Sequence, residues 1–108
     1  MDGFDKITEA YIKELKKTAT CQRYKDKLKA LKKDEELYKK VNEYRNKRFE
    51  LQKNLNPDEL YDQSDRLERE YAFLYDNPVS AGYLDAEVAL CRMIQDISMK
   101  ITQSVDFE

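Results

Sequence analysis

Histidine and tryptophan are absent from the 108-residue chain, and glycine, proline and cysteine each occur only twice. Without histidine, the sequence lacks the usual proton shuttle near neutral pH and the commonest zinc ligand. Two glycines, at positions 3 and 82, cannot form a glycine-rich phosphate-binding loop. Carboxylates are plentiful, but no pair stands in the apolar setting that separates an acid from a base. We therefore expect a protein that is not an enzyme.

The two cysteines, Cys21 and Cys91, lie far apart and form no CxxC pair. The chain shows no signal peptide, so we expect a cytoplasmic protein with free thiols. Each thiol is better explained as packing than as a nucleophile, since no histidine can activate it. A dimer would bring four cysteines together, formally enough for an iron–sulfur cluster, but their spacing does not support one. We expect no metal and no cofactor.

Long apolar runs are also missing, and none approaches the roughly 18 residues of a membrane span. Ile, Leu, Val and Phe account for 24 of the 108 residues, whereas 39% of the chain is charged. This apolar content lies just above the level, roughly 20%, below which a highly charged chain is suspected of disorder. Such a chain can supply apolar stripes on helices but not a thick core. A second copy would supply further helices to bury them.

Capping signals divide the chain into four predicted helices within a single domain, residues 1–108. The helices are expected at about 5–32, 35–55, 57–76 and 78–104, each with apolar residues at steps of three and four. Asp34 and the Asn-Pro pairs at 56–57 and 77–78 mark helix starts. The segment TATC, residues 18–21, has poor helix propensity and could bend or locally fray the first helix. The fold class is therefore all-α: four helices, the first and last long, in an antiparallel bundle completed by homodimerisation.

The last helix carries a second apolar line beside its main stripe. This second line consists of Leu84, Val88 and Cys91. Small residues nearby would let another element pack closely against the helix: Ala81, Gly82, Ala86 and Ala89. A helix that is apolar nearly all round is usually buried, so a partner is implied. We predict partner or dimer contacts at seven positions: Tyr83, Leu84, Ala86, Glu87, Val88, Leu90 and Cys91.

Two residues within this region carry expectations of their own. Glu87 is interpreted as a carboxylate at the edge of the stripe, paired with a lysine or arginine of the basic first half. Gly82 costs a helix about 1 kcal/mol relative to alanine, so we expect another backbone to approach it closely.

Fourteen residues resemble the YlbF/YmcA (Com_YlbF) family of small helical regulators from Gram-positive bacteria. They are Thr18, Tyr24, Leu28, Leu31, Asp34, Glu35, Tyr83, Ala86, Glu87, Leu90, Ile97, Ile101, Ser104 and Val105. The resemblance implies a dimeric, non-catalytic, cytoplasmic regulator linked to competence, sporulation and biofilm formation. It also implies partners among related family proteins and the endoribonuclease RNase Y, with an effect on mRNA processing. Some relatives carry cysteines beyond the last helix and are associated with iron–sulfur clusters; this sequence has none there, which argues against a cluster and leaves membership of that complex open.

Charge supplies the alternative function. Residues 1–54 hold 16 Lys and Arg against 10 Asp and Glu, whereas residues 55–108 hold 4 against 12. A basic first half could bind RNA directly. The lysines are interleaved with acids, however, and no aromatic-basic platform accompanies them. We therefore favour electrostatic pairing between the halves or with a partner copy, and protein binding over nucleic-acid binding.

Overall fold

A computed structural model describes residues 2–106, and every regular element in this range is an α-helix. The elements are α1 (Asp2–Lys17), α2 (Ala19–Lys32), α3 (Glu35–Leu51), α4 (Pro57–Glu70), α5 (Phe73–Asp76) and α6 (Pro78–Asp106). The predicted all-α class is confirmed. The predicted number of helices is not, because 5–32 is divided into α1 and α2 and 57–76 into α4 and α5.

Thr18 separates α1 from α2. Its backbone is extended, with φ −68° and ψ 149°, and its hydroxyl accepts a hydrogen bond from the amide of Cys21 at 3.1 Å. The same hydroxyl donates to the carbonyl oxygen of Leu15. A threonine that caps the next helix cannot also continue the previous one. The bend that the TATC segment suggested is thus a complete break, and the single helix over 5–32 is wrong.

Polar caps also start α3, α4 and α6. The Asp34 carboxylate accepts from the amide of Leu37 at 3.1 Å, at the start of α3. Asn56 accepts from the amide of Asp58 at 3.1 Å, and Asn77 accepts from that of Val79 at 2.9 Å. In each Asn-Pro pair, the proline occupies the first helical position, where its missing N–H costs nothing.

Two helix ends differ from the sequence prediction for reasons of packing. Helix α3 ends at Leu51 instead of residue 55. Leu55 is 94% exposed, so burial of its side chain does not stabilise a further helical turn. Helix α4 stops before Tyr71, whose backbone leaves the helical region at φ −107° and ψ 15°. This change of direction lets both Tyr71 and Leu74 enter the core, where they are 3% and 0% exposed.

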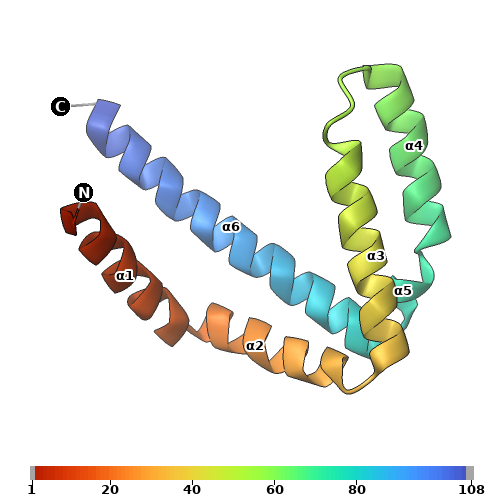
Figure 1. Cartoon of the computed structure of the whole chain (residues 1–108), viewed down its shortest axis with the longest axis horizontal. Coiled ribbons are helices and arrows are strands. Elements are labelled where there is room, and N and C mark those ends of the chain that lie inside the picture. The colour runs from red at the N-terminus through yellow and green to blue at the C-terminus, as the bar shows by residue number, and fades with distance from the viewer. Residues whose placement is uncertain (1, 107–108) are drawn as a thin grey trace.

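The helices form two arms that meet at a corner (Figure 1). One arm holds α2 against the first half of α6, with α1 continuing beside the far half of α6. The other arm is the antiparallel pair of α3 and α4. The radius of gyration is 17.2 Å, against about 13 Å for a compact domain of this length. Within residues 2–106, the single chain is therefore open and is not a closed four-helix bundle.

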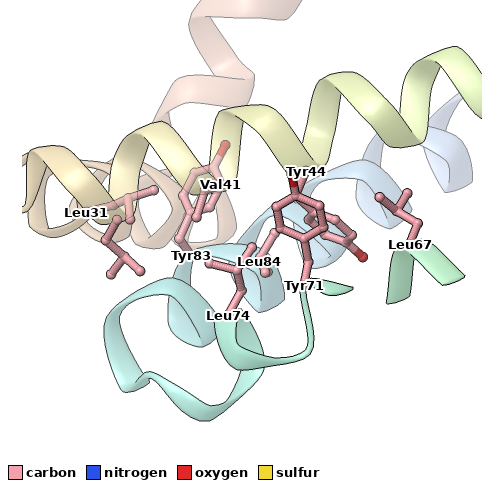
Figure 2. Packing of buried hydrophobic residues seen from close by; sticks show 9 residues of the cluster. Leu31, Val41, Tyr44, Leu67, Tyr71, Leu74, Tyr83 and Leu84 are labelled. Atoms are coloured by element: carbon pink, nitrogen blue, oxygen red, sulfur yellow. The ribbon is translucent and has the colours of Figure 1, made fainter. Parts of the chain in front are cut away.

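The hydrophobic core lies at the corner, where all the elements except α1 contribute to it (Figure 2). It comprises Leu31, Leu37, Val41, Tyr44, Leu67, Tyr71, Leu74, Tyr83 and Leu84. The Tyr44 and Tyr71 rings pack with their centroids 5.4 Å apart. The Tyr44 hydroxyl donates to Glu68 at 2.7 Å, so a buried ring keeps a satisfied polar end. Short helix α5 is tied to α6 by the buried Ser80 hydroxyl, which donates to the carbonyl oxygen of Leu74.

Candidate functional site

A polar network centred on Glu87 joins the two arms at their inner corner. Glu87, on α6, is only 8% exposed. One carboxylate oxygen lies 2.7 Å from Nε of Arg45, and the other lies 3.1 Å from Nη2 of Arg48. The Tyr83 hydroxyl donates to Glu87 at 3.2 Å, which leaves the Tyr24 hydroxyl to donate to Tyr83 at 3.2 Å. Side chains from α2, α3 and α6 thus meet around one carboxylate.

Helical spacing brings these groups together. Arg45 and Arg48 lie three residues apart on α3, and Tyr83 and Glu87 lie four apart on α6, so each pair shares a face. The guanidinium of Arg45 lies 5.9 Å from the centre of the Tyr83 ring, and that of Arg48 lies 5.1 Å from the centre of the Tyr44 ring. Each arginine therefore gains both an ion pair and a ring contact, which fixes its orientation.

The two buried tyrosines beneath the arginines stay neutral over a wide pH range. Burial raises the pKa of Tyr83 well above its ordinary value, and the hydrogen bond with Tyr24 adds to that effect. Burial likewise raises the pKa of Tyr44, assisted by hydrogen bonds with Tyr75 and Glu68. Neutral hydroxyls can donate to Glu87 and Glu68, so they stabilise the carboxylates instead of repelling them.

The geometry of Glu87 suits a structural ion pair better than acid–base chemistry. Both of its oxygens contact arginines, and a tyrosine hydroxyl occupies a further position on one of them. The predicted pairing of Glu87 with a basic residue of the first half is confirmed. The sequence did not identify Arg45, Arg48 or Tyr24 as members of this network, because their contacts depend on the angle between the arms.

An open-sided groove of about 430 Å³ lies over this network. Its lining residues are Tyr24, Arg45, Asn46, Arg48, Phe49, Gln52, Glu87, Leu90 and Cys91. We call it the crook groove. It combines two half-exposed guanidiniums, side-chain amides and an apolar wall, and it opens on the inner side of the corner between α3 and α6.

The seven predicted partner residues divide into two groups. Tyr83, Leu84, Ala86 and Glu87 are buried within the chain itself, where they pack the corner or hold the arginines. Val88, Leu90 and Cys91 reach the surface, Val88 with 42% of its area exposed. Leu90 and Cys91 line the crook groove. Contact with a partner stays a prediction for all seven, and the three surface residues are the ones available for it in this conformation.

The expected close approach of a backbone to Gly82 is wrong. A Cβ added at Gly82 would have the Lys27 side chain as its nearest neighbour, with Cδ at 3.4 Å. That distance is an ordinary van der Waals contact with a flexible side chain. Within the chain, therefore, packing does not require glycine at this position.

Cys21 and Cys91 are both free thiols, the first buried in α2 and the second exposed on α6. Over residues 2–106, no group of three or more His, Cys, Asp or Glu side chains is placed to hold a metal ion. The absence of a cofactor stays a prediction. In the same range, no helix combines the length and apolar character that crossing a membrane requires.

Burial falls steadily along the arm that contains α1 and α6. On α1, Leu15 and Tyr11 are half-buried, whereas Ile7 and Phe4 are 66% and 68% exposed. The α6 stripe behaves in the same way: it runs from half-buried to exposed along Ile94, Ile97, Ile101 and Val105. Helix α1 leads end to end into α2 across Thr18, and it scarcely contacts α6 (Figure 1). We call the exposed end of these stripes, Phe4, Ile7, Ile101 and Val105, the distal apolar face.

Comparisons with known proteins give a consistent result. Residues 6–106 match the family described as control of competence regulator ComK, YlbF/YmcA. A UPF0342 protein from Caldicellulosiruptor bescii is 32% identical over 96 residues, which cover 87% of this chain and 81% of that protein. A UPF0342 protein from Desulfitobacterium hafniense is 34% identical over 77 residues, covering 69% of this chain and 62% of that protein. No solved structure matches the chain.

Proposed function

The chain belongs to the YlbF/YmcA family, described as control of the competence regulator ComK, and from this premise we propose a non-catalytic regulator that works by binding proteins. The observation that carries this proposal is the distal apolar face. Stripes with the spacing of a core continue along α1 and α6 to side chains that the chain leaves exposed. Apolar side chains arranged in this way gain stability when another protein covers them.

A second copy of the chain is the simplest protein to cover this face. In a two-fold symmetric dimer, each copy would present its own α1 and α6 to those of the other, so both sets of stripes would be buried together. The α1 and α6 helices of the two copies would then together form the antiparallel bundle that one open chain lacks. The radius of gyration of 17.2 Å supports this proposal, because a chain this open buries less of its surface on folding than a compact domain does.

Paired variants test the dimer by analytical ultracentrifugation. Ile101→Asp places a charge on the distal apolar face, where the side chain is 57% exposed in the single chain. Because the charge remains solvated in the monomer, we expect dissociation with helical content retained. Gln103→Asp adds the same charge two residues away, off the α6 stripe, and should leave the dimer intact. A monomeric wild-type protein, or equal behaviour of the two variants, would contradict the proposal.

Aspartate at Leu84 would not test the interface. Leu84 is 2% exposed in the core of the chain, so a charge there would be buried without a partner and would unfold the corner. Aspartate at Val88 is more informative, since that side chain is 42% exposed. If a partner also contacts α6 at Val88, Val88→Asp should weaken association while the chain stays folded.

The resemblance to relatives extends the proposal to specific partners and processes. We propose related family proteins and RNase Y as binding partners, with mRNA processing, competence, sporulation and biofilm formation as the processes controlled. A regulator of mRNA processing would act in the cytoplasm, which is the location we propose. Titration of purified RNase Y with the wild-type protein tests the partner directly, and the absence of saturable binding would remove RNase Y from the proposal.

Direct RNA binding is the alternative function, and exposed lysines of α2 are the observation in its favour. Lys25, Lys29 and Lys32 all reach solvent on this helix. Titration with single-stranded RNA at two salt concentrations distinguishes the functions. Saturable binding that weakens steeply with salt would support RNA binding, whereas no binding at low salt would eliminate it.

A further inference from the structure

We propose that the crook groove binds an acidic segment of a partner protein, one that carries carboxylates beside a bulky apolar side chain. This inference rests on the proposed function, because it gives a protein-binding regulator a second contact surface, separate from the distal apolar face. It concerns the inner corner between the arms, where α2, α3 and α6 meet over a groove of about 430 Å³.

The charge in the groove is unbalanced. Two arginines, Arg45 and Arg48, face one carboxylate, Glu87, and the six other lining residues named above are uncharged. The arginine side chains are 42% and 37% exposed, so water or a ligand can reach them. A guanidinium has five N–H donors, and one ion pair with Glu87 leaves donors on each arginine for a further carboxylate.

Glu87 positions the two arginines as well as pairing with them. Its carboxylate is fixed by burial and by the Tyr83 hydroxyl, and each of its oxygens holds one guanidinium. The ring contacts of Arg45 and Arg48 restrain them further. A ligand carboxylate would therefore meet cations that have already lost much of their conformational freedom, which reduces the entropy cost of binding.

An apolar wall lies next to the cations. Phe49 is 61% exposed although it sits beside the groove, and Leu90 and the Tyr24 ring are half-buried in its lining. A bulky apolar side chain would bury Phe49 and Leu90, while neighbouring carboxylates would reach Arg45 and Arg48. This combination favours an acidic segment with an apolar residue over a purely polyanionic ligand such as RNA.

Fluorescence anisotropy tests the inference with a defined probe. The probe is a fluorescein-labelled peptide in which four glutamates surround a central Leu-Phe pair. A matched peptide with glutamines in place of the glutamates reports on the carboxylates. A second, with alanines in place of Leu-Phe, reports on the apolar wall. We expect saturable binding of the first peptide at low salt, weakened when either feature is removed.

Variants at Gln52 localise the binding without disturbing the Glu87 network. Gln52 is exposed at the end of α3 and lines the groove. In water at low salt, two unit charges about 7 Å apart interact by about 0.6 kcal/mol, which corresponds to about a threefold change in affinity. Gln52→Glu should therefore weaken the acidic peptide about threefold, and Gln52→Lys should strengthen it by a similar factor. Gln63→Glu, exposed on α4 outside the groove, should leave the affinity unchanged.

Four results would overturn the inference. The first is no saturable binding of the acidic peptide up to millimolar concentration. The second is equal effects of Gln52→Glu and Gln63→Glu. The third is tighter binding of a single-stranded RNA probe at the same groove, as judged by the Gln52 variants. A change in the protein's molar mass caused by Gln52→Glu would also overturn it, since a second copy would then be the occupant. The dimer is measured separately, so either proposal can fail alone.

Discussion

Glu87→Gln removes the negative charge that Arg45 and Arg48 share, while nearly preserving the size of the side chain. The wild-type carboxylate forms an ion pair with Nε of Arg45 at 2.7 Å, and it accepts hydrogen bonds from Arg48 at 3.1 Å and from the Tyr83 hydroxyl at 3.2 Å. The amide oxygen of glutamine can replace one of these acceptors. Its NH₂ group must then face the donors of the other arginine, so one guanidinium loses its partner.

The expected loss in the free energy of unfolding follows from burial. A hydrogen bond to a charged group contributes about 1.5–3 kcal/mol when water is excluded. Glu87 is 8% exposed, but the arginine side chains are 42% and 37% exposed, so water compensates for part of the loss. We expect Glu87→Gln to destabilise the protein by about 2 kcal/mol.

Urea unfolding followed by circular dichroism measures this change. All variants must be compared at one protein concentration, because self-association adds to apparent stability. Asp85→Asn is the matched control on the same helix. Asp85 pairs with Arg23 at 2.7 Å, but the two side chains are 72% and 46% exposed, so its loss should cost less than about 0.5 kcal/mol. Equal losses for the two variants, or less than about 0.5 kcal/mol for Glu87→Gln, would refute the reasoning.

Three further perturbations test other parts of the fold by urea unfolding. Gly82→Ala should raise the free energy of unfolding by up to about 1 kcal/mol, because the added methyl meets only a flexible lysine; a loss would contradict this packing. The pKa values of Tyr44 and Tyr83 are raised in the folded chain. Below about pH 10, both hydroxyls are protonated in the folded and in the unfolded chain, so their contribution to stability is fully present. Above about pH 10, unfolding releases their protons, so stability should fall by up to about 1.4 kcal/mol per pH unit for each tyrosine. Tyr83→Phe should reduce that slope, and an unchanged slope would argue against the raised pKa. Thr18→Ala should cost about 1 kcal/mol through loss of the α2 cap, and no loss would show that the cap is dispensable.

Local chemistry explains why the helix starts could be predicted from sequence. Asp34, Asn56 and Asn77 each satisfy backbone amides of the turn that follows, and this interaction needs only nearby residues. The apolar spacing likewise predicted the all-α class, since each stripe requires a helix and not a strand.

Helix ends and breaks were harder to predict because they depend on distant packing. The stop at Leu51 reflects a lack of neighbours for Leu55, and the break at Tyr71 reflects burial of Leu74 in a core built from other helices. The sequence pattern is equally compatible with continuation at both points. Only the break at Thr18 had a local signal, the weak helix propensity of residues 18–21.

The candidate site shows the same division. The charge imbalance between the halves and the apolar setting of Glu87 predicted its pairing with a basic residue. The choice of Arg45 and Arg48 could not be predicted, because the residues lie about 40 positions from Glu87 and meet it only through the angle between the arms. The prediction at Gly82 failed for a related reason. A glycine in a helix does not by itself show that another backbone lies close, and here the nearest neighbour is a side chain.

Self-association through the distal apolar face is the central claim, and the molar mass of the wild-type protein tests it most directly. Size-exclusion chromatography with light scattering, performed over a range of micromolar concentrations, should give twice the 12.9 kDa of one chain. The exposed side chains of Phe4, Ile7, Ile101 and Val105 would then be covered by the second copy. A stable, folded species of 12.9 kDa throughout that range would contradict the account.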